Sequence, residues 1–166
     1  MSEGHEVRVA VHEAGHAVAY LVIGRPIERA IVAQDEHQVD PVKGTHVAYI
    51  DEAVAMAAGW AAEERRLRLA GLAEDEIHTA WISGGHHNDR AMLSALAERV
   101  DSVSIADAEA YADQLVEQHW DLILTVASAL LEGEVLDQSR MEALGAQHGL
   151  RFEIGDKTQA RTGSSR

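Results

Sequence analysis

The stretch VHEAGHAVAYL, residues 11–21, places two histidines four residues apart among small apolar side chains. Apolar residues around it recur at helical spacing, and this periodicity predicts a helix over residues 6–24. Gly24, followed by Arg25 and Pro26, is typical of a helix end. The stretch therefore predicts a buried helix that carries His12, Glu13 and His16.

Histidines four residues apart lie on the same face of a helix, one turn from each other. His12 and His16 can therefore offer ring nitrogens to one metal ion, and Glu13 can take a proton from a water bound to that metal. This arrangement is the HExxH motif of zinc peptidases. Ala14 and Gly15 keep this helix slim, so that a neighbouring element can approach with a third ligand.

Chance is the competing explanation, because the chain contains 10 histidines and many glutamates. The context favours a metal, since two histidines and a glutamate without partners are costly inside an apolar helix. The chain has no cysteine, so any metal must be held by histidine, carboxylate and water.

The predicted fold class is α+β, mostly α, with a small β-sheet. Residues 27–34 form a short β-branched run, and residues 44–50 alternate in the manner of a strand, with a polar loop between the two. We expect these two runs to pair antiparallel. One domain over residues 1–155 and a disordered tail over residues 156–166 are expected.

The other predicted helices each follow a polar residue that can cap the first turn. These are a helix capped by Asp51 and ended by Gly71, a helix capped by Asn88 over residues 89–100, a helix opened by Ser104 with Asp107 and running to about Trp120 or on to Glu132, and a short helix capped by Asp137. The loop SGGHHND, residues 83–89, is expected between the first two.

Charge and hydropathy exclude several classes of protein. The chain carries 14 basic and 28 acidic residues, for a net charge of -14, and this excess repels the phosphates of nucleic acids. No apolar run is long enough to span a bilayer, and the N-terminus is too polar for a signal peptide. A cytoplasmic protein without nucleic-acid partners is expected.

A catalytic zinc ion usually has three protein ligands, so a third residue must complete the pair of histidines. The candidates are Glu63 or Glu64, His86 or His87, and Asp89. The first turn of a helix stabilises a charged carboxylate, which favours Asp89 as an aimed ligand. A carboxylate in the first turn can also serve only to stabilise the helix end. For Asp89 taken alone, this second explanation is the better one.

Four blocks of sequence together resemble the peptidase domain of FtsH-type zinc proteases. HEAGHAVAYLV, MAAGWAAEERRL and SGGHHNDRAMLSA occur in that family's order and approximate spacing, and VEQHWDLILTVASALLEGEVLDQSRMEAL is similar to its C-terminal helical pair. The similarity touches roughly residues 7–145. The HEAGH block is weakly specific, whereas the four blocks in order are strongly specific.

The resemblance implies a zinc metalloendopeptidase with His12, His16 and Asp89 as metal ligands and Glu13 as the catalytic base. Glu63 or Glu64 would then support a ligand through its free ring nitrogen. The predicted strand at 44–50 would match the edge strand on which that family holds an extended peptide. Zn²⁺ is the expected cofactor, and an unfolded or extended protein or peptide is the expected substrate.

The sequence also departs from the family's pattern. It contains no ATPase motif and no membrane span, so activity is expected to be ATP-independent or to rely on a separate ATPase. The connection after the Asp89 helix is shorter, so hexamer contacts cannot be assumed, although an oligomer is possible. Trp60 stands where the family tends to have arginine. His86 and His87 are unusual, and a solvated loop is the favoured interpretation for both.

Three other interpretations compete with the peptidase. One is a zinc-binding, catalytically silent interaction module, which the presence of Glu13 argues against. A second is a small phage-regulator type of HExxH peptidase, whose glutamate-bearing helix is poorly matched by AAEERRLRLAG. A third is an all-helical interaction protein with accidental histidines, which zinc content would exclude.

Overall fold

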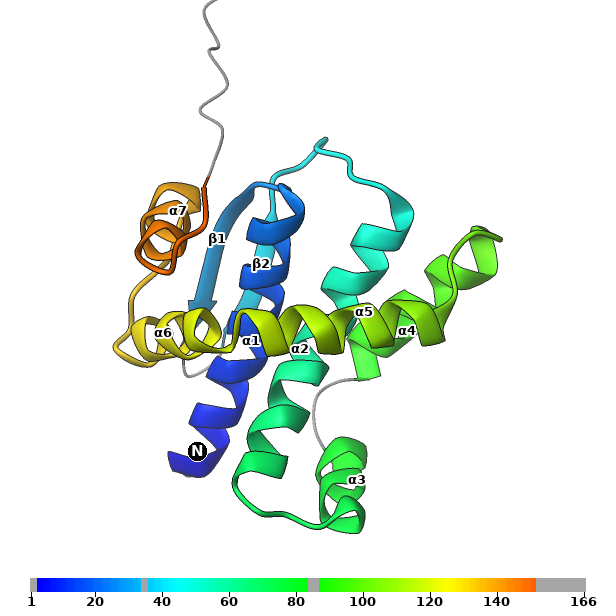
Figure 1. Cartoon of the computed structure of the whole chain (residues 1–166), viewed down its shortest axis with the longest axis horizontal. Coiled ribbons are helices and arrows are strands. Elements are labelled where there is room, and N and C mark those ends of the chain that lie inside the picture. The colour runs from blue at the N-terminus through cyan, green and yellow to red at the C-terminus, as the bar shows by residue number, and fades with distance from the viewer. Residues whose placement is uncertain (1–2, 34–35, 84–86, 152–166) are drawn as a thin grey trace, which may run out of the picture.

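The computed structural model describes residues 3–33, 36–83 and 87–151, which are mostly helical with one small sheet (Figure 1). Within these ranges the elements follow in the order α1 (Glu3–Ile23), β1 (Ile27–Val32), β2 (His37–Pro41), α2 (Tyr49–Leu69), α3 (Glu74–Ser83), α4 (His87–Arg99), α5 (Ile105–Gln118), α6 (Trp120–Leu131) and α7 (Gln138–Gln147). The predicted fold class, α+β and mostly α, is confirmed. The predicted tail lies outside the described residues.

Helix α1 is the central element of the core. All residues from 10 to 21 are buried, because α2, α6 and the sheet pack around this helix. A helix buried on all sides needs apolar residues all round, which explains the uniformly small, apolar composition of the stretch. The helix ends as predicted: Gly24 has a φ of 76°, and the Arg25 amide donates to the Tyr20 carbonyl at 2.9 Å.

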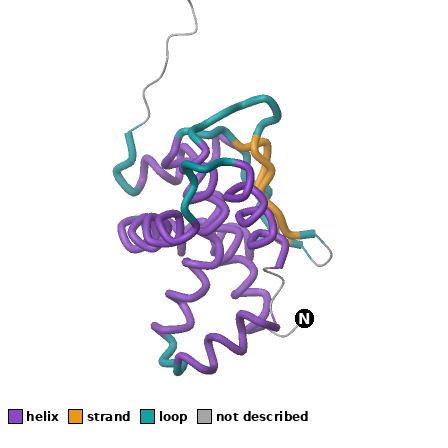
Figure 2. The backbone as a smooth tube through the Cα atoms, turned by 90° about the vertical axis from the view of Figure 1, so that its right-hand side faces the viewer, coloured by secondary structure: helices purple, strands orange, loops and turns teal. Residues whose placement is uncertain are grey.

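Helices α5 and α6 run across α1 and α2 (Figure 1), and α6 packs on α1 while α5 packs on α2. The strands lie at one edge of the helical body (Figure 2). Small side chains fill the crossing of α1 and α2. A Cβ at Gly15 would lie 2.5 Å from the Ala58 carbonyl oxygen, so the close contact between these helices requires glycine at that position.

The sheet pairs a different second strand from the predicted one. Strand β1 pairs antiparallel with β2, residues 37–41, which were expected to be a polar loop, and residues 44–48 form no strand. Arg29 lies opposite Asp40 and binds it at 2.9 Å. The short connection between β1 and β2 costs less loop-closure entropy than a longer connection to residues 44–50 would. The cross-strand ion pair stabilises the pairing of β1 with β2 further. The predicted edge strand at 44–50 is therefore wrong.

The predicted long helix is present, but its start is different. Helix α2 begins at Tyr49, so that Tyr49 and Ile50 are helical rather than extended. Ala48 precedes the helix without a side-chain cap, and Asp51 lies in the first turn. There its charge favours the helix N-terminus without capping it. Gly71 ends the helix region with a φ of 84°, as predicted.

Helix α3 is absent from the prediction because its sequence carries little apolar periodicity. Among its residues 74–80, only Ile77 is buried. The Glu76 carboxylate accepts a hydrogen bond from the Ala73 amide at 2.8 Å, which satisfies one free donor at the start of the helix. Helix α4 begins at His87, so Asn88 lies inside the first turn and is not its N-cap.

The N-caps predicted at Ser104 and Asp137, in the C-terminal part of the chain, are confirmed. Ser104 accepts from the Asp107 amide at 3.3 Å, and Asp137 accepts from the Arg140 amide at 2.8 Å. The helix that Ser104 opens does not continue to Glu132. A break at His119, with φ -114° and ψ 21°, separates α5 from α6. No helix in the described ranges has the length and apolar character that crossing a membrane requires.

Candidate metal centre

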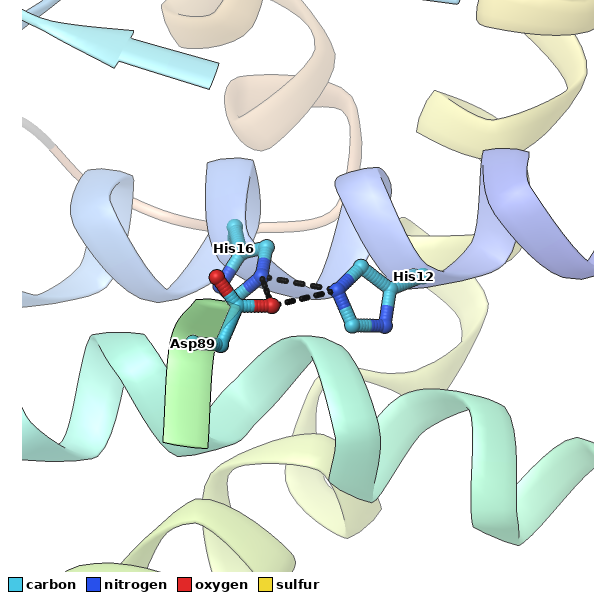
Figure 3. A group of neighbouring side chains, drawn as sticks. All are labelled: His12, His16 and Asp89. Atoms are coloured by element: carbon cyan, nitrogen blue, oxygen red, sulfur yellow. Dashed lines mark hydrogen bonds and ion pairs between the residues drawn. The ribbon is translucent and has the colours of Figure 1, made fainter. Parts of the chain in front are cut away.

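His12, His16 and Asp89 form one compact group in which two helices meet (Figure 3). The histidines lie one turn apart on α1, and Asp89 comes from the first turn of α4. The Asp89 Oδ2 atom lies 2.9 Å from His12 Nε2 and 3.4 Å from His16 Nε2. The two Nε2 atoms are 3.0 Å apart. The three residues predicted as ligands are thus brought together and can hold a metal ion.

The spacing of these three atoms suits a tetrahedral ion. Donors bound at 2.0–2.1 Å to tetrahedral zinc stand about 3.3 Å from each other. The three separations here are 3.0, 2.9 and 3.4 Å. Both histidines are buried, whereas Asp89 is partly exposed. Asp89 therefore lies on the more exposed side of the group.

The orientation of His16 is set by the backbone of α2. Its Nδ1 lies 2.7 Å from the Ala55 carbonyl oxygen, which can only accept, so Nδ1 carries a proton and donates. The neutral ring then has its free electron pair on Nε2, the atom that faces His12 and Asp89. Sequence reasoning missed this partner, because a backbone carbonyl leaves no signature in the residue type.

Glu63 lies beside the ring nitrogen of His12 that points away from Asp89. This nitrogen, Nδ1, lies 3.6 Å from Glu63 Oε2, and the other Glu63 oxygen accepts from Arg8 Nε at 2.7 Å. Glu63 is only 1% exposed, so this carboxylate acts in a low-dielectric setting. Sequence reasoning missed Arg8, although its position one helical turn before His12 is visible in the sequence.

The choice that the sequence left between Glu63 and Glu64 is resolved by the helix face on which each lies. Glu64 points to another partner, the guanidinium of Arg68, at 2.5 Å. Burial raises the pKa of Glu64, and the charge of Arg68 opposes that rise. Neither glutamate belongs to the group of His12, His16 and Asp89 that is able to hold a metal ion.

Helix α2 approaches the centre at a glycine. A Cβ at Gly59 would overlap His16 Nε2 and lie 2.8 Å from His12 Nε2. Every residue except glycine would therefore push a side-chain atom into the space between the two rings. This requirement explains a glycine inside a long helix, where it otherwise costs about 1 kcal/mol relative to alanine.

Glu13 is buried, with 7% of its surface exposed. Among the described residues, no hydrogen bond or ion pair engages its carboxylate, although its charge acts on His12. A buried carboxylate beside a metal site is able to exchange a proton with a reacting water. Its predicted role as the base stays a prediction.

The metal-free group is held together by charge. Burial by itself lowers the pKa of His12, but hydrogen bonds to Asp89 and Glu63 and the charges of Glu13 and Asp89 outweigh it and raise that pKa to about 9. Burial would raise the pKa of Asp89, but the two histidines hold it well below its usual range. A metal ion bound by these residues would therefore replace the proton on His12.

Two further predicted positions are only partly described. His86, a candidate third ligand, lies outside the described residues, and His87 begins α4 without a described side chain.

Trp60, the departure from the family pattern, lines a cavity of about 30 Å³ beside Asp89, together with Met56 and Leu93. Trp60 therefore lies next to the candidate centre.

Comparison with known proteins adds no relative. No protein-family model matches the chain, and no curated protein matches it. The resemblance to FtsH-type peptidases thus stays a prediction that rests on the four sequence blocks. The geometry of the described residues supports one firm conclusion: this is a mostly helical α+β chain in which His12, His16 and Asp89 form a group able to hold a metal ion.

Proposed function

We propose that the chain is a zinc-dependent metalloendopeptidase that acts without ATP or with a separate ATPase. The observation that carries the proposal is the convergence of His12, His16 and Asp89 on one point, with Glu13 next to His12 in the same buried turn. Two histidines and a carboxylate are a ligand set found in catalytic zinc sites, which keep one position for water or substrate.

The donor set also favours zinc among the common metals. Imidazole nitrogen suits zinc, whereas calcium and magnesium prefer sites built from oxygen alone. The carboxylate of Glu63 and the carbonyl of Ala55 each engage the Nδ1 atom of one histidine. Partners of this kind orient metal-binding histidines and raise their basicity.

Each residue then has a defined part in peptide hydrolysis. A bound zinc ion would supply Lewis acidity to water and to the peptide carbonyl. The Glu13 carboxylate takes the proton of the attacking water and passes it to the nitrogen of the leaving amine. Asp89 is ionised in the metal-free group, where the two histidines outweigh burial and hold its pKa well below its usual range, and it would bind zinc as a carboxylate.

An extended or unfolded polypeptide is the substrate that this proposal requires. A buried centre can be reached by a peptide strand but not by a bond inside a folded domain. A disordered protein such as casein is therefore the appropriate first substrate. The negative charge of the chain, -14, makes nucleic acid an unsuitable partner.

The test measures zinc first and cleavage second. Purified wild-type protein should contain about one zinc per chain by elemental analysis, and Asp89→Ala should lose most of it. Wild-type protein should cleave casein in a chelator-sensitive manner, and Glu13→Gln should keep zinc while losing cleavage. Zinc without any cleavage would instead favour the silent binding module, and no zinc uptake would contradict both.

A further inference from the structure

A groove of about 350 Å³ lies between α2, α4 and the segment that precedes α2. Its lining begins close to the candidate metal centre. Met56 lines both this groove and the small cavity that contains Asp89. Met56 also lies one helical turn before Gly59, the residue against which the two histidine rings pack. The groove and the cavity beside Asp89 therefore adjoin at Met56.

One face of α4 leads away from the centre along this groove. Asp89, Met92, Leu96 and Arg99 follow at intervals of three, four and three residues, which places them on one helical stripe. The last three line the groove. From Asp89 to Arg99 the helix rises about 15 Å. The stripe thus runs from a metal ligand, over apolar side chains, to a cation.

Helix α2 supplies the opposite wall in the same order. Gly59, Met56, Glu52 and Tyr49 lie at intervals of three or four residues, and the last three line the groove. Tyr49 is 59% exposed and stands at the end far from the centre. Both walls therefore present apolar side chains near the metal ligands and polar ones at the far end.

The far end carries an uncompensated positive charge. Arg25 is paired with Glu52, so these two charges cancel. Arg99 is exposed, and no ion pair or hydrogen bond joins its guanidinium to another residue that the structure describes. This cation stands out on a chain whose net charge is -14. A guanidinium binds a carboxylate through paired hydrogen bonds, and a carboxylate is the anionic group that a peptide carries.

We propose that this groove binds a substrate peptide in extended form and that Arg99 recognises a carboxylate on it, about four residues from the bond that is cut. An extended chain advances about 3.3 Å per residue, so four or five residues span the 15 Å stripe. The apolar middle of the groove takes the intervening side chains. The inference rests on the proposed peptidase function, because that function defines the centre from which the peptide is measured.

Two sources can supply this carboxylate: an aspartate or glutamate side chain, or the C-terminus of the peptide. Peptides with an amidated C-terminus separate the two. Decapeptides of alanine and glutamine each carry a single glutamate at a different position. Each is compared with the same peptide in which glutamine replaces that glutamate. Binding is measured by fluorescence anisotropy on the Glu13→Gln protein with zinc, so that the result does not depend on cleavage.

We expect glutamate at one position to tighten binding about tenfold over glutamine, as one favourable charge contact does. Arg99→Gln should abolish this difference. Arg151→Gln is the matched control, because Arg151 is also exposed and follows α7, away from α2 and α4; it should leave the difference unchanged. If glutamate does not tighten the binding of amidated peptides and only a free C-terminus does, Arg99 binds the C-terminal carboxylate.

The NMR signals of the methionine methyl groups show where the peptide binds. Met56 and Met92 line the groove, while Met141 is fully buried in the core. Bound peptide should shift the first two signals and leave that of Met141 in place. The groove proposal is overturned if neither a glutamate at any position nor a free C-terminus tightens binding, if peptides fail to bind, or if the preference for a carboxylate survives Arg99→Gln. Selective binding without cleavage by wild-type protein would overturn the peptidase and leave the groove as a peptide-binding site.

Discussion

Gly59 of α2 packs directly against the ring of His16 of α1, so closely that a Cβ on the glycine would overlap the Nε2 atom. The contact joins the two longest helices at the point where the candidate ligands converge. It explains how α2, which contributes none of the three ligands, shapes the centre. The geometry of the group therefore depends on the distance between two helix backbones.

Gly59→Ala should abolish metal binding while the protein stays folded. Alanine favours the helix by about 1 kcal/mol over glycine, so α2 itself gains stability, but the new methyl group occupies the space between the two histidine rings. Zinc content and circular dichroism measured together check this. Gly4→Ala is the control, since nothing lies within 4 Å of a Cβ at that helical position. Unchanged zinc content in Gly59→Ala would contradict the geometry.

Gly15→Ala should destabilise the protein by about 1–3 kcal/mol, the usual cost of overpacking a well-filled core. The new Cβ would lie 2.5 Å from the Ala58 carbonyl oxygen, which is backbone and cannot rotate away. Chemical denaturation of the metal-free protein measures the loss in free energy of unfolding. Equal stability of Gly15→Ala and wild type would show that the two helices can separate freely.

Glu63→Gln should weaken zinc affinity about 10- to 100-fold, the usual effect of removing a residue that supports a histidine ligand. The glutamine removes the negative charge beside His12 Nδ1 while keeping the size of the side chain. Competition with a chromogenic chelator gives the affinity. Glu64→Gln is the neighbouring control, since Glu64 pairs with Arg68 rather than with a ligand. Equal losses in both variants would exclude a specific role for Glu63.

Zinc binding should release a proton below pH 9. The pKa of His12 is raised from 6.5 to about 9 in the metal-free fold, so its ring is protonated at pH 7.5 and must lose that proton to bind zinc. Calorimetry in two buffers of different ionisation enthalpy counts the protons released. We expect about one proton per zinc from His12 at pH 7.5 and progressively fewer as the pH rises through 9. Glu63→Gln, which keeps all three candidate ligands, should lower the count, because the hydrogen bond to Glu63 also raises the His12 pKa.

The same shift predicts the pH dependence of the metal-free protein. Because the folded pKa of His12 lies above the unfolded value, its contribution to stability is fully present below pH 6.5 and is lost as the pH rises through about 9. The melting temperature measured with chelator should therefore fall across this window. A flat profile between pH 6.5 and 9 would show that His12 is not charged in the metal-free fold.

The local features of this protein could be predicted from its sequence. The pairing of His12 and His16 follows from their spacing on a helix, whatever the helix packs against. The ends of helices at Gly24 and Gly71 and the caps at Ser104 and Asp137 likewise depend on a few neighbouring residues. At these positions residue type and spacing were sufficient, whereas the caps predicted in the same way at Asp51 and Asn88 were wrong, because α2 and α4 begin before these residues.

Features that depend on competition between segments were decided only by the tertiary structure. Residues 44–50 alternate like a strand, yet residues 37–41 pair with β1 because they are closer along the chain and offer Asp40 to Arg29. Which carboxylate joins the two histidines was decided in the same way. Both Glu63 and Asp89 are candidate ligands in the sequence. Only the packing of the helices places Glu63 beside His12 Nδ1 and Asp89 beside the Nε2 atoms of the two histidines. Packing fixes these distances through many weak contacts that no single residue encodes.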